Sequence, residues 1–338
     1  MDKQSLEQIA QAMVADGKGL LAADESTGTI KKRFDSIQHE SSFESRRDYR
    51  EMLFRTQEAM ENHISGVILY DETIRQDAAD GTPLTDIITA AGSIPGIKVD
   101  TGAKDLAGHA GEMVTEGLDG LRDRLREYYE LGARFAKWRA VINIADTLPS
   151  RACLSANTHA LARYAALCQE NNIVPIVEPE VIMDGQHSQA RCLEVTSATL
   201  KQLYEQLDEQ NVHLEGTILK PNMIVSGTQH AEQAGIEQVA EATLACFREN
   251  VPEAVPGIVF LSGGQSDIDA TAHLDAMNKI GGFSWKLSFS YGRALQAAPL
   301  KTWGGKPENI AAAQAAFNHR AKMNGLAALG QWEASLEA

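Results

Sequence analysis

The sequence contains little cysteine and no long apolar run. Its 338 residues include four cysteines, none of them in a C-x-x-C pair: Cys153, Cys168, Cys192 and Cys246. A chain of this length can bury a large core without disulfide bonds. The first 18 residues lack the basic and apolar regions of a secretory signal, and the longest uncharged run, residues 254–266, is too short to span a bilayer. We therefore expect a cytoplasmic protein with reduced thiols and no membrane anchor.

Basic residues are scarce relative to acidic ones. The chain has 31 Lys and Arg against 46 Asp and Glu, a net charge of −15, and its isoelectric point is about 5.1. Nucleic acids and anionic membranes bind to basic surfaces, so neither is expected as a partner. An anionic small molecule would also be repelled by the overall charge, and would need a local concentration of basic side chains in an otherwise negative protein.

Short apolar segments that end in polar or charged residues recur eight times. They cover residues 19–24, 65–70, 96–100, 135–142, 173–180, 216–221, 257–264 and 285–292. Their starts lie roughly 30 to 45 residues apart, enough for a crossover helix each time. Helical spacing is seen between them, for example at Leu118, Leu121, Leu125 and Tyr128, and over residues 157–169.

This alternation predicts an α/β protein with a single (β/α)8 TIM barrel over residues 1–338 and a short C-terminal tail from about residue 327. A doubly wound sheet with a smaller second domain is the alternative. The sequence has neither a G-x-G-x-x-G nor a G-x-x-x-x-G-K-[ST] motif, which disfavours a doubly wound nucleotide-binding domain.

Charged residues lie within the predicted strands. Residues two apart in a strand share one face, which pairs Lys98 with Asp100, Lys137 with Arg139, and Glu178 with Glu180. One such lysine could be an exposed edge residue. Several at strand ends predict a cluster at the barrel mouth, where barrel enzymes place their catalytic groups.

A crowded lysine has a chemical use. The ordinary pKa of a lysine is about 10.4, and partial burial or a neighbouring cation lowers a lysine pKa. Lys220, with Lys137 nearby, could therefore supply an uncharged amine for a Schiff base, while Glu178 transfers the protons. Metal-dependent chemistry is disfavoured, because none of the nine histidines follows another at H-x-H or H-x-x-x-H spacing. We expect no metal and no cofactor.

Two loops have the composition of anion sites. SGGQSD after the seventh strand contains Ser262 and Gly263, and SYGRAL after the eighth contains Ser290, Gly292 and Arg293. An S-G-G sequence alone is more often a simple turn. Its position matters here, because TIM barrels frequently bind phosphate with the loops after strands seven and eight. A further basic cluster at residues 31–33 is interpreted as a solvent-exposed helix face at Lys31, and less so at Arg33.

Seven motifs occur in order and together closely resemble class I fructose-bisphosphate aldolases, over about residues 18–326. They are ADEST (23–27), GIKVD (96–100), FAKWR (135–139), VPIVEPE (174–180), LEGTILKPNM (214–223), FLSGGQS (260–266) and SFSYGRALQ (288–296). The resemblance implies metal-independent, reversible cleavage of fructose 1,6-bisphosphate to dihydroxyacetone phosphate and glyceraldehyde 3-phosphate in glycolysis and gluconeogenesis. It also implies a homotetramer.

The resemblance implies a role for each matching residue. Lys220 matches the lysine that forms the Schiff base, and Glu178 the general acid/base, which Glu180 helps to place. Asp24 matches the carboxylate that takes the hydroxyl proton when the carbon–carbon bond breaks. Lys137 matches the cation that lies beside the nucleophile and touches the substrate. Substrate contacts are expected from Lys98, Arg139, Glu180, Ser262, Gly263, Ser290, Gly292 and Arg293, and from Lys32 and Arg33 in the region of the second phosphate.

Two features depart from the family pattern, and two alternatives stay open. Animal members end in a longer tail with a terminal tyrosine, whereas the last tyrosine here is Tyr291, and Thr29 stands where relatives often have serine. A Schiff-base barrel for another sugar phosphate, such as a transaldolase-like or deoxyribose-phosphate aldolase-like enzyme, is one alternative. A catalytically inactive binding scaffold is the other. The preference between fructose 1,6-bisphosphate and fructose 1-phosphate is not readable from the residues.

Overall fold

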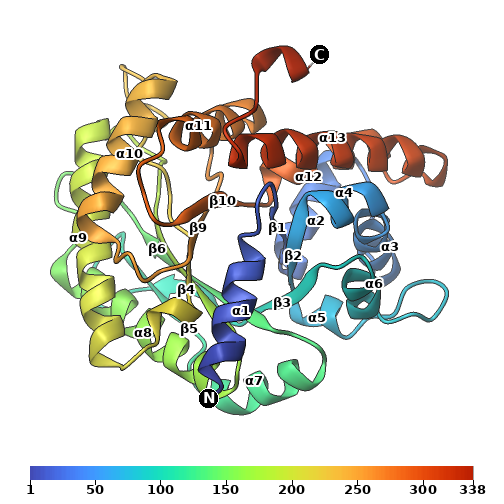
Figure 1. Ribbon diagram of the computed structural model, residues 1–338, viewed down its shortest axis with the longest axis horizontal. Helices are drawn as coiled ribbons and strands as arrows, with labels where there is room; N and C mark the ends of the chain where they lie inside the picture. Colours follow the sequence, from blue (N-terminus) through green and yellow to red (C-terminus); the bar gives the residue numbers. More distant parts are fainter. Residues whose placement is uncertain (338) are drawn as a thin grey trace.

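The structure is a computed structural model that describes residues 1–337, and its centre is a closed barrel of eight parallel strands (Figure 1). Around the barrel the strand order is β1-β10-β9-β8-β7-β6-β3-β2. The strands are β1 Gly19–Ala23, β2 Ile64–Leu69, β3 Ile94–Lys98, β6 Phe135–Ile142, β7 Val174–Val181, β8 Ile218–Leu219, β9 Gly257–Phe260 and β10 Lys286–Tyr291. All eight predicted strands are present in the predicted order, and the prediction of a (β/α)8 barrel is confirmed.

Helices surround the barrel, with α8 to α10 on one side and α2 to α6 on the other (Figure 1). They are α1 Lys3–Met13, α2 Thr27–Ser36, α3 Phe43–Phe54, α4 Gln57–Asn62, α5 Asp71–Ile74, α6 Leu84–Ala90, α7 Leu121–Glu130, α8 Arg151–Glu170, α9 Gln189–Glu209, α10 Ile236–Asn250, α11 Asp267–Ile280, α12 Arg293–Trp303 and α13 Ile310–Ala328. Short 3-10 helices cover η1 Leu214–Gly216, η2 Pro307–Asn309 and η3 Ala334–Glu337. Several helices start at a serine whose hydroxyl accepts a backbone N–H, as Ser26 does for α2 and Ser266 for α11.

The barrel interior is apolar at one end and charged at the other. Strand alternation turns Phe135, Ile176 and Ile218 inward, where they pack with residues of α1, including Leu6 and Met13, in one buried cluster. A Cβ added at Gly96 would lie 2.2 Å from the Phe135 ring, so this neighbour must be glycine for the ring to fill the barrel. The apolar plug leaves the inward positions nearer the carboxyl ends of the strands for charged residues.

Three details lie outside the sequence-based prediction. An antiparallel hairpin of β4 Gly102–Asp105 and β5 Met113–Glu116 follows β3. Helix α7 begins at Leu121, so Leu118 lies ahead of the predicted helix. Helix α13 continues to Ala328, and the segment after it is anchored by Glu337, which pairs with the buried Arg320. Within residues 1–337 no helix is both long enough and apolar enough to cross a membrane.

Candidate active site

A cavity of about 370 Å³ opens at the carboxyl ends of the barrel strands, within the usual size range of small-molecule sites. Its walls contain every predicted site residue except Lys32. The lining residues are Ala22, Asp24, Glu25, Ser26, Thr29, Arg33, Lys98, Asp100, Gly102, Ala103, Lys137, Arg139, Val141, Glu178, Glu180, Lys220, Leu261, Ser262, Gly263, Ser290, Gly292 and Arg293.

Strand register brings the charged residues of neighbouring strands side by side. Lys98 of β3 is the register partner of Lys137 of β6, and Arg139 of β6 is the partner of Glu178 of β7. These residues share the inward face with the apolar plug, because the side chains alternate along each strand. Lys220 follows β8 directly and continues the same inward face after Ile218.

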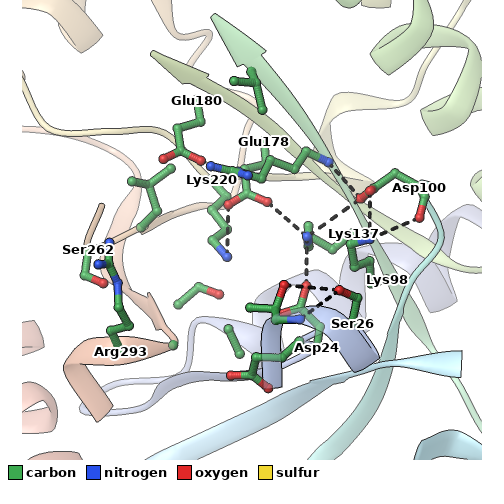
Figure 2. A pocket seen from close by; sticks show the side chains of 18 of the residues that line it. Asp24, Ser26, Lys98, Asp100, Lys137, Glu178, Glu180, Lys220, Ser262 and Arg293 are labelled. Carbon is green, nitrogen blue, oxygen red and sulfur yellow. Dashed lines mark hydrogen bonds and ion pairs between the residues drawn. The ribbon is translucent and has the colours of Figure 1, made fainter. Parts of the chain in front are cut away.

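The centre of the site is a chain of buried ion pairs (Figure 2). The Lys220 Nζ lies 3.1 Å from Glu178 Oε1, and the Lys137 Nζ lies 3.4 Å from Glu178 Oε2 and 2.8 Å from Asp24 Oδ2. Lys137, Glu178 and Lys220 are all at most 4% exposed. The structure thus connects all four predicted catalytic residues. Asp24 and Glu178 contact Lys137 directly, and Lys220 is linked to it through Glu178.

The ion pairs fix the charge state of two groups. Burial alone would raise the pKa of Asp24, but the ammonium groups of Lys137 and Lys220 hold it well below its usual range. Burial alone would lower the pKa of Lys137, but the carboxylates of Asp24, Glu178 and Asp100 raise it above the ordinary lysine value. The pairing therefore favours the anion of Asp24 and the cation of Lys137.

One side of the cavity has the features of an anion site. Gly292 is the N-cap of α12, and Arg293 is its first residue, so the helix N-terminus faces the cavity. The Ser290 hydroxyl is buried and has no hydrogen-bond partner within residues 1–337. Figure 2 shows Ser262 and Arg293 together on the side of the cavity away from Asp100. A phosphate group would supply acceptors for these donors.

The N-terminus of α2 provides a second set of donors. Ser26 caps this helix, its hydroxyl lies 3.1 Å from that of Thr29, and both residues line the cavity. The helical period places Thr29 and Arg33, four residues apart, on the cavity side. Lys32 is exposed and is not among the residues that line the cavity, so its contact with substrate stays a prediction that the cavity lining does not support.

Arg33 lies in the cavity, close to the loop after β10. A Cβ added at Gly292 would be 3.6 Å from the Arg33 Nη2, so the guanidinium is next to the loop after β10. It also pairs with the buried Glu25. Arg33 thus lies beside Gly292 in the cavity, and its expected contact with the second phosphate stays a prediction.

Glu180 pairs with Arg139, so a role in placing Glu178 directly has no contact to support it among the described ion pairs. Lys98 Nζ lies 2.9 Å from Asp100 Oδ1. Asp100 also accepts from the Arg139 backbone N–H, at 3.3 Å, and lies 3.8 Å from the Lys137 Nζ. Asp100 was not expected to act in the site, although its spacing from Lys98 was a usable signal.

Glu25 was also omitted. It receives Arg33, lies 3.8 Å from the buried Arg50, and accepts a hydrogen bond from Gln296 at 2.9 Å. Its partners come from three different helices, so no local spacing could have identified it. For residues 1–337, no group of three or more His, Cys, Asp or Glu side chains is arranged to hold a metal ion.

Fold and site together define a (β/α)8-barrel enzyme whose cavity combines buried lysines, carboxylates and anion-binding loops. Comparison with known proteins identifies the enzyme class as a carbon–carbon lyase. A family model described as "Fructose-bisphosphate aldolase class-I", of the glycolytic type, matches residues 5–338. The chain belongs to the class I fructose-bisphosphate aldolase family.

Individual relatives agree over nearly the whole chain. The chain is 60% identical over 334 residues to a protein of Xanthomonas axonopodis pv. citri named "Probable fructose-bisphosphate aldolase class 1", covering 98% of this chain and 100% of that one. It is 53% identical over 318 residues to "Fructose-bisphosphate aldolase 6, cytosolic" of Arabidopsis thaliana, covering 94% and 88%.

A solved structure is similar throughout. It is the fructose-bisphosphate aldolase of Plasmodium falciparum, in a complex with TRAP and a small-molecule inhibitor. The TM-score is 0.95 at 45% sequence identity, with 98% of this chain and 95% of that chain covered. The family resemblance expected from the motifs is confirmed.

Proposed function

We propose that this protein cleaves fructose 1,6-bisphosphate reversibly to dihydroxyacetone phosphate and glyceraldehyde 3-phosphate, through a Schiff base on Lys220 and without a metal or cofactor. Family membership supports the substrate class. The observation that carries the mechanism is the 3.1 Å contact between the Lys220 Nζ and Glu178 Oε1 in a buried cavity. Glu178 is positioned to take a proton from the lysine before the amine attacks the ketone.

The remaining steps use groups already in contact. Addition of the Lys220 amine to the ketone gives a carbinolamine, and Glu178 returns a proton to its hydroxyl so that water leaves and an iminium forms. Asp24 takes the proton of the substrate hydroxyl as the carbon–carbon bond breaks, and the bond electrons pass into the iminium. Glyceraldehyde 3-phosphate leaves. Protonation and hydrolysis of the remaining enamine release dihydroxyacetone phosphate and regenerate the amine.

Lys137 is the cation shared by the two carboxylates that transfer protons. It lies between Asp24 and Glu178, at 2.8 and 3.4 Å, and its positive charge stabilises the ionised form of Asp24, the form that can take the hydroxyl proton. Ser262, Gly263, Ser290, Gly292 and Arg293 would bind the phosphate at the ketose end, together with Arg33. Ser26 and Thr29, at the N-terminus of α2, would contact the other phosphate.

Borohydride trapping tests the mechanism. The protein is reduced in the presence of dihydroxyacetone phosphate, digested and mapped by mass spectrometry, with and without EDTA. We expect the peptide containing Lys220 to gain mass in both samples, and Lys220→Met to remain unmodified. An unmodified Lys220, or loss of activity in EDTA, would contradict the proposal. Lys286→Met is the matched control, since Lys286 is exposed and pairs with Asp16 outside the cavity.

We also infer the assembly and setting from the resemblance and the composition. A homotetramer in the cytoplasm is expected, serving glycolysis and gluconeogenesis. Light scattering of the purified protein measures the assembly, and a monomer would contradict this part of the proposal.

A further inference from the structure

The loop after β9 is supported from behind by side chains that lie outside the cavity. The Ser262 carbonyl oxygen accepts two hydrogen bonds from Gln265, one from its backbone N–H at 3.1 Å and one from its Nε2 at 3.2 Å. The Oε1 of the same amide lies 2.6 Å from the Nδ1 of His273, a buried residue of α11. An amide oxygen can only accept, so the His273 Nδ1 carries the proton and donates it.

These contacts determine the direction of one peptide group. In a trans peptide the C=O and the following N–H point in opposite directions. The Ser262 C=O is directed at Gln265, so the Gly263 N–H is directed away from Gln265, toward the side on which Gly263 lines the cavity. The direction of this donor therefore depends on the orientation of the Gln265 amide.

The next peptide group is fixed in the opposite sense. The Gly263 carbonyl oxygen accepts from the Arg293 guanidinium, and the Gly264 N–H donates to the Met183 Sδ at 2.8 Å. Gly263 has a φ of +56°, and a Cβ there would lie 3.0 Å from that sulfur. Position 263 thus needs glycine. Along the loop, the Gly263 N–H is directed toward the cavity, and the Gly264 N–H is directed toward Met183.

The Ser262 carbonyl oxygen and His273 hold the Gln265 side-chain amide from its two ends. If the amide rotated by half a turn, its Oε1 would face the Ser262 carbonyl oxygen, and two acceptors would oppose each other. The Ser262 carbonyl oxygen disfavours this state, and with the amide in its observed orientation the His273 Nδ1 donates to the Oε1. Without that donor the Gln265 side-chain amide is held less firmly, so one of the two hydrogen bonds that direct the Ser262–Gly263 peptide is weakened, while the bond from the Gln265 backbone N–H remains.

We propose that His273 is a positioning residue for the phosphate end of the substrate. It acts through Gln265 to hold the Gly263 N–H toward the cavity, and does not touch the substrate itself. This inference rests on the proposed function, since it assigns the loop to a phosphate group. It concerns affinity for that group, and leaves the Lys220 chemistry unchanged.

Two substitutions at one position test the inference. His273→Leu removes the donor, while His273→Asn keeps an N–H close to the place of Nδ1. We expect His273→Leu to raise KM for fructose 1,6-bisphosphate and the inhibition constant of inorganic phosphate by about tenfold, the effect of losing a typical hydrogen bond, with a smaller change in kcat. His273→Asn should restore most of the affinity.

A phosphate-free ketone separates positioning from general damage. Borohydride trapping of Lys220 with dihydroxyacetone should be equal in wild type and His273→Leu, because this ketone has no phosphate. Asn278→Ala is the matched control, since Asn278 lies on the same helix and binds carbonyl oxygens of Leu274, Leu287 and Ala327. It should leave the phosphate inhibition constant unchanged.

The outcomes are distinguishable. Wild-type protein that forms no imine on Lys220 would contradict the proposed function. Normal wild-type activity with an unchanged phosphate inhibition constant in His273→Leu would overturn only the present inference, as would equal losses in His273→Leu and His273→Asn. If His273→Leu does not fold, Gln265→Leu removes the amide that lies between His273 and Ser262. KM for fructose 1,6-bisphosphate and the phosphate inhibition constant are then measured on that variant.

Discussion

Lys137 is the residue whose replacement should disturb this protein most. It lies 2.8 Å from Asp24, 3.4 Å from Glu178 and 3.8 Å from Asp100, and it is 3% exposed. Lys137→Met keeps the length of the side chain and removes its charge. Three carboxylates would then remain in one buried region without their shared cation.

The expected cost follows from the burial of these groups. Removing one partner of a buried ion pair typically costs about 3 to 5 kcal/mol, because the remaining charge is left uncompensated. The variant should therefore lose about 3 to 5 kcal/mol of its free energy of unfolding at pH 8. This is a large part of the total stability of an ordinary folded protein.

The loss should shrink on acidification. In the wild type the pKa of Asp24 is held below its usual range, so Asp24 contributes stability that is present above about pH 3.9, its ordinary pKa, and is lost only below that value. Without Lys137, burial and like charge should raise the pKa of Asp24 above 3.9. The folded variant then binds a proton that the unfolded chain does not, so its stability falls as pH rises through the raised pKa.

Urea unfolding at pH 5 and pH 8 measures both effects. Lys32→Met is the matched control, because Lys32 is exposed on α2 and does not line the cavity; we expect it to change little at either pH. A loss below about 1 kcal/mol for Lys137→Met at pH 8 would refute the reasoning, since that is the range of exposed ion pairs. An equal loss at both pH values would refute the assignment of the effect to the carboxylates.

Two further predictions concern the catalytic carboxylate and the thiols. Glu178→Gln removes the proton acceptor beside Lys220, and we expect the cleavage rate to fall by about 10² to 10⁴, with the far-UV circular dichroism unchanged; a loss below tenfold would assign the proton transfer to another group. Burial raises the pKa of both Cys153 and Cys246 to about 11, and all four cysteines are buried. Ellman's reagent should therefore titrate fewer than one thiol in the native protein and four in urea, and rapid reaction of native thiols would contradict this.

The barrel could be predicted from the sequence because its two signals are local. Apolar runs mark the strands, and a period of two within them assigns Lys137, Glu178 and Lys220 to the inward face before any contact is known. The β4–β5 hairpin gave no such signal, since its four-residue strands carry exposed and half-buried side chains. A short strand without an apolar face is not distinguishable from a loop by pattern alone.

The errors and omissions concern helices and long-range contacts. Lys32 and Arg33 are adjacent, and only the phase of α2 decides that Arg33 faces the cavity while Lys32 faces solvent. Glu25 has partners on other helices, such as Arg50 and Gln296, and His273 of α11 contacts Gln265 in the loop before that helix, so neither contact follows from a local residue pattern. Residue types in a motif can indicate the chemistry, but such supporting contacts need the assembled fold.

The charge of the cavity changes the explanation of how this acidic protein would bind a bisphosphate. Six basic and five acidic side chains line the cavity. The basic side chains are concentrated there, as an anionic ligand was expected to need, but their excess is only one positive charge. Most of these cations already face carboxylates, as Lys98 faces Asp100. Arg293 instead donates to the neutral Gly263 carbonyl oxygen, so its charge remains available to an anion.

Phosphate binding would therefore rely on Arg293, on backbone N–H groups and on the N-termini of α2 and α12, whose directions are fixed by the fold. Positioned donors, more than net charge, would select the phosphate groups here.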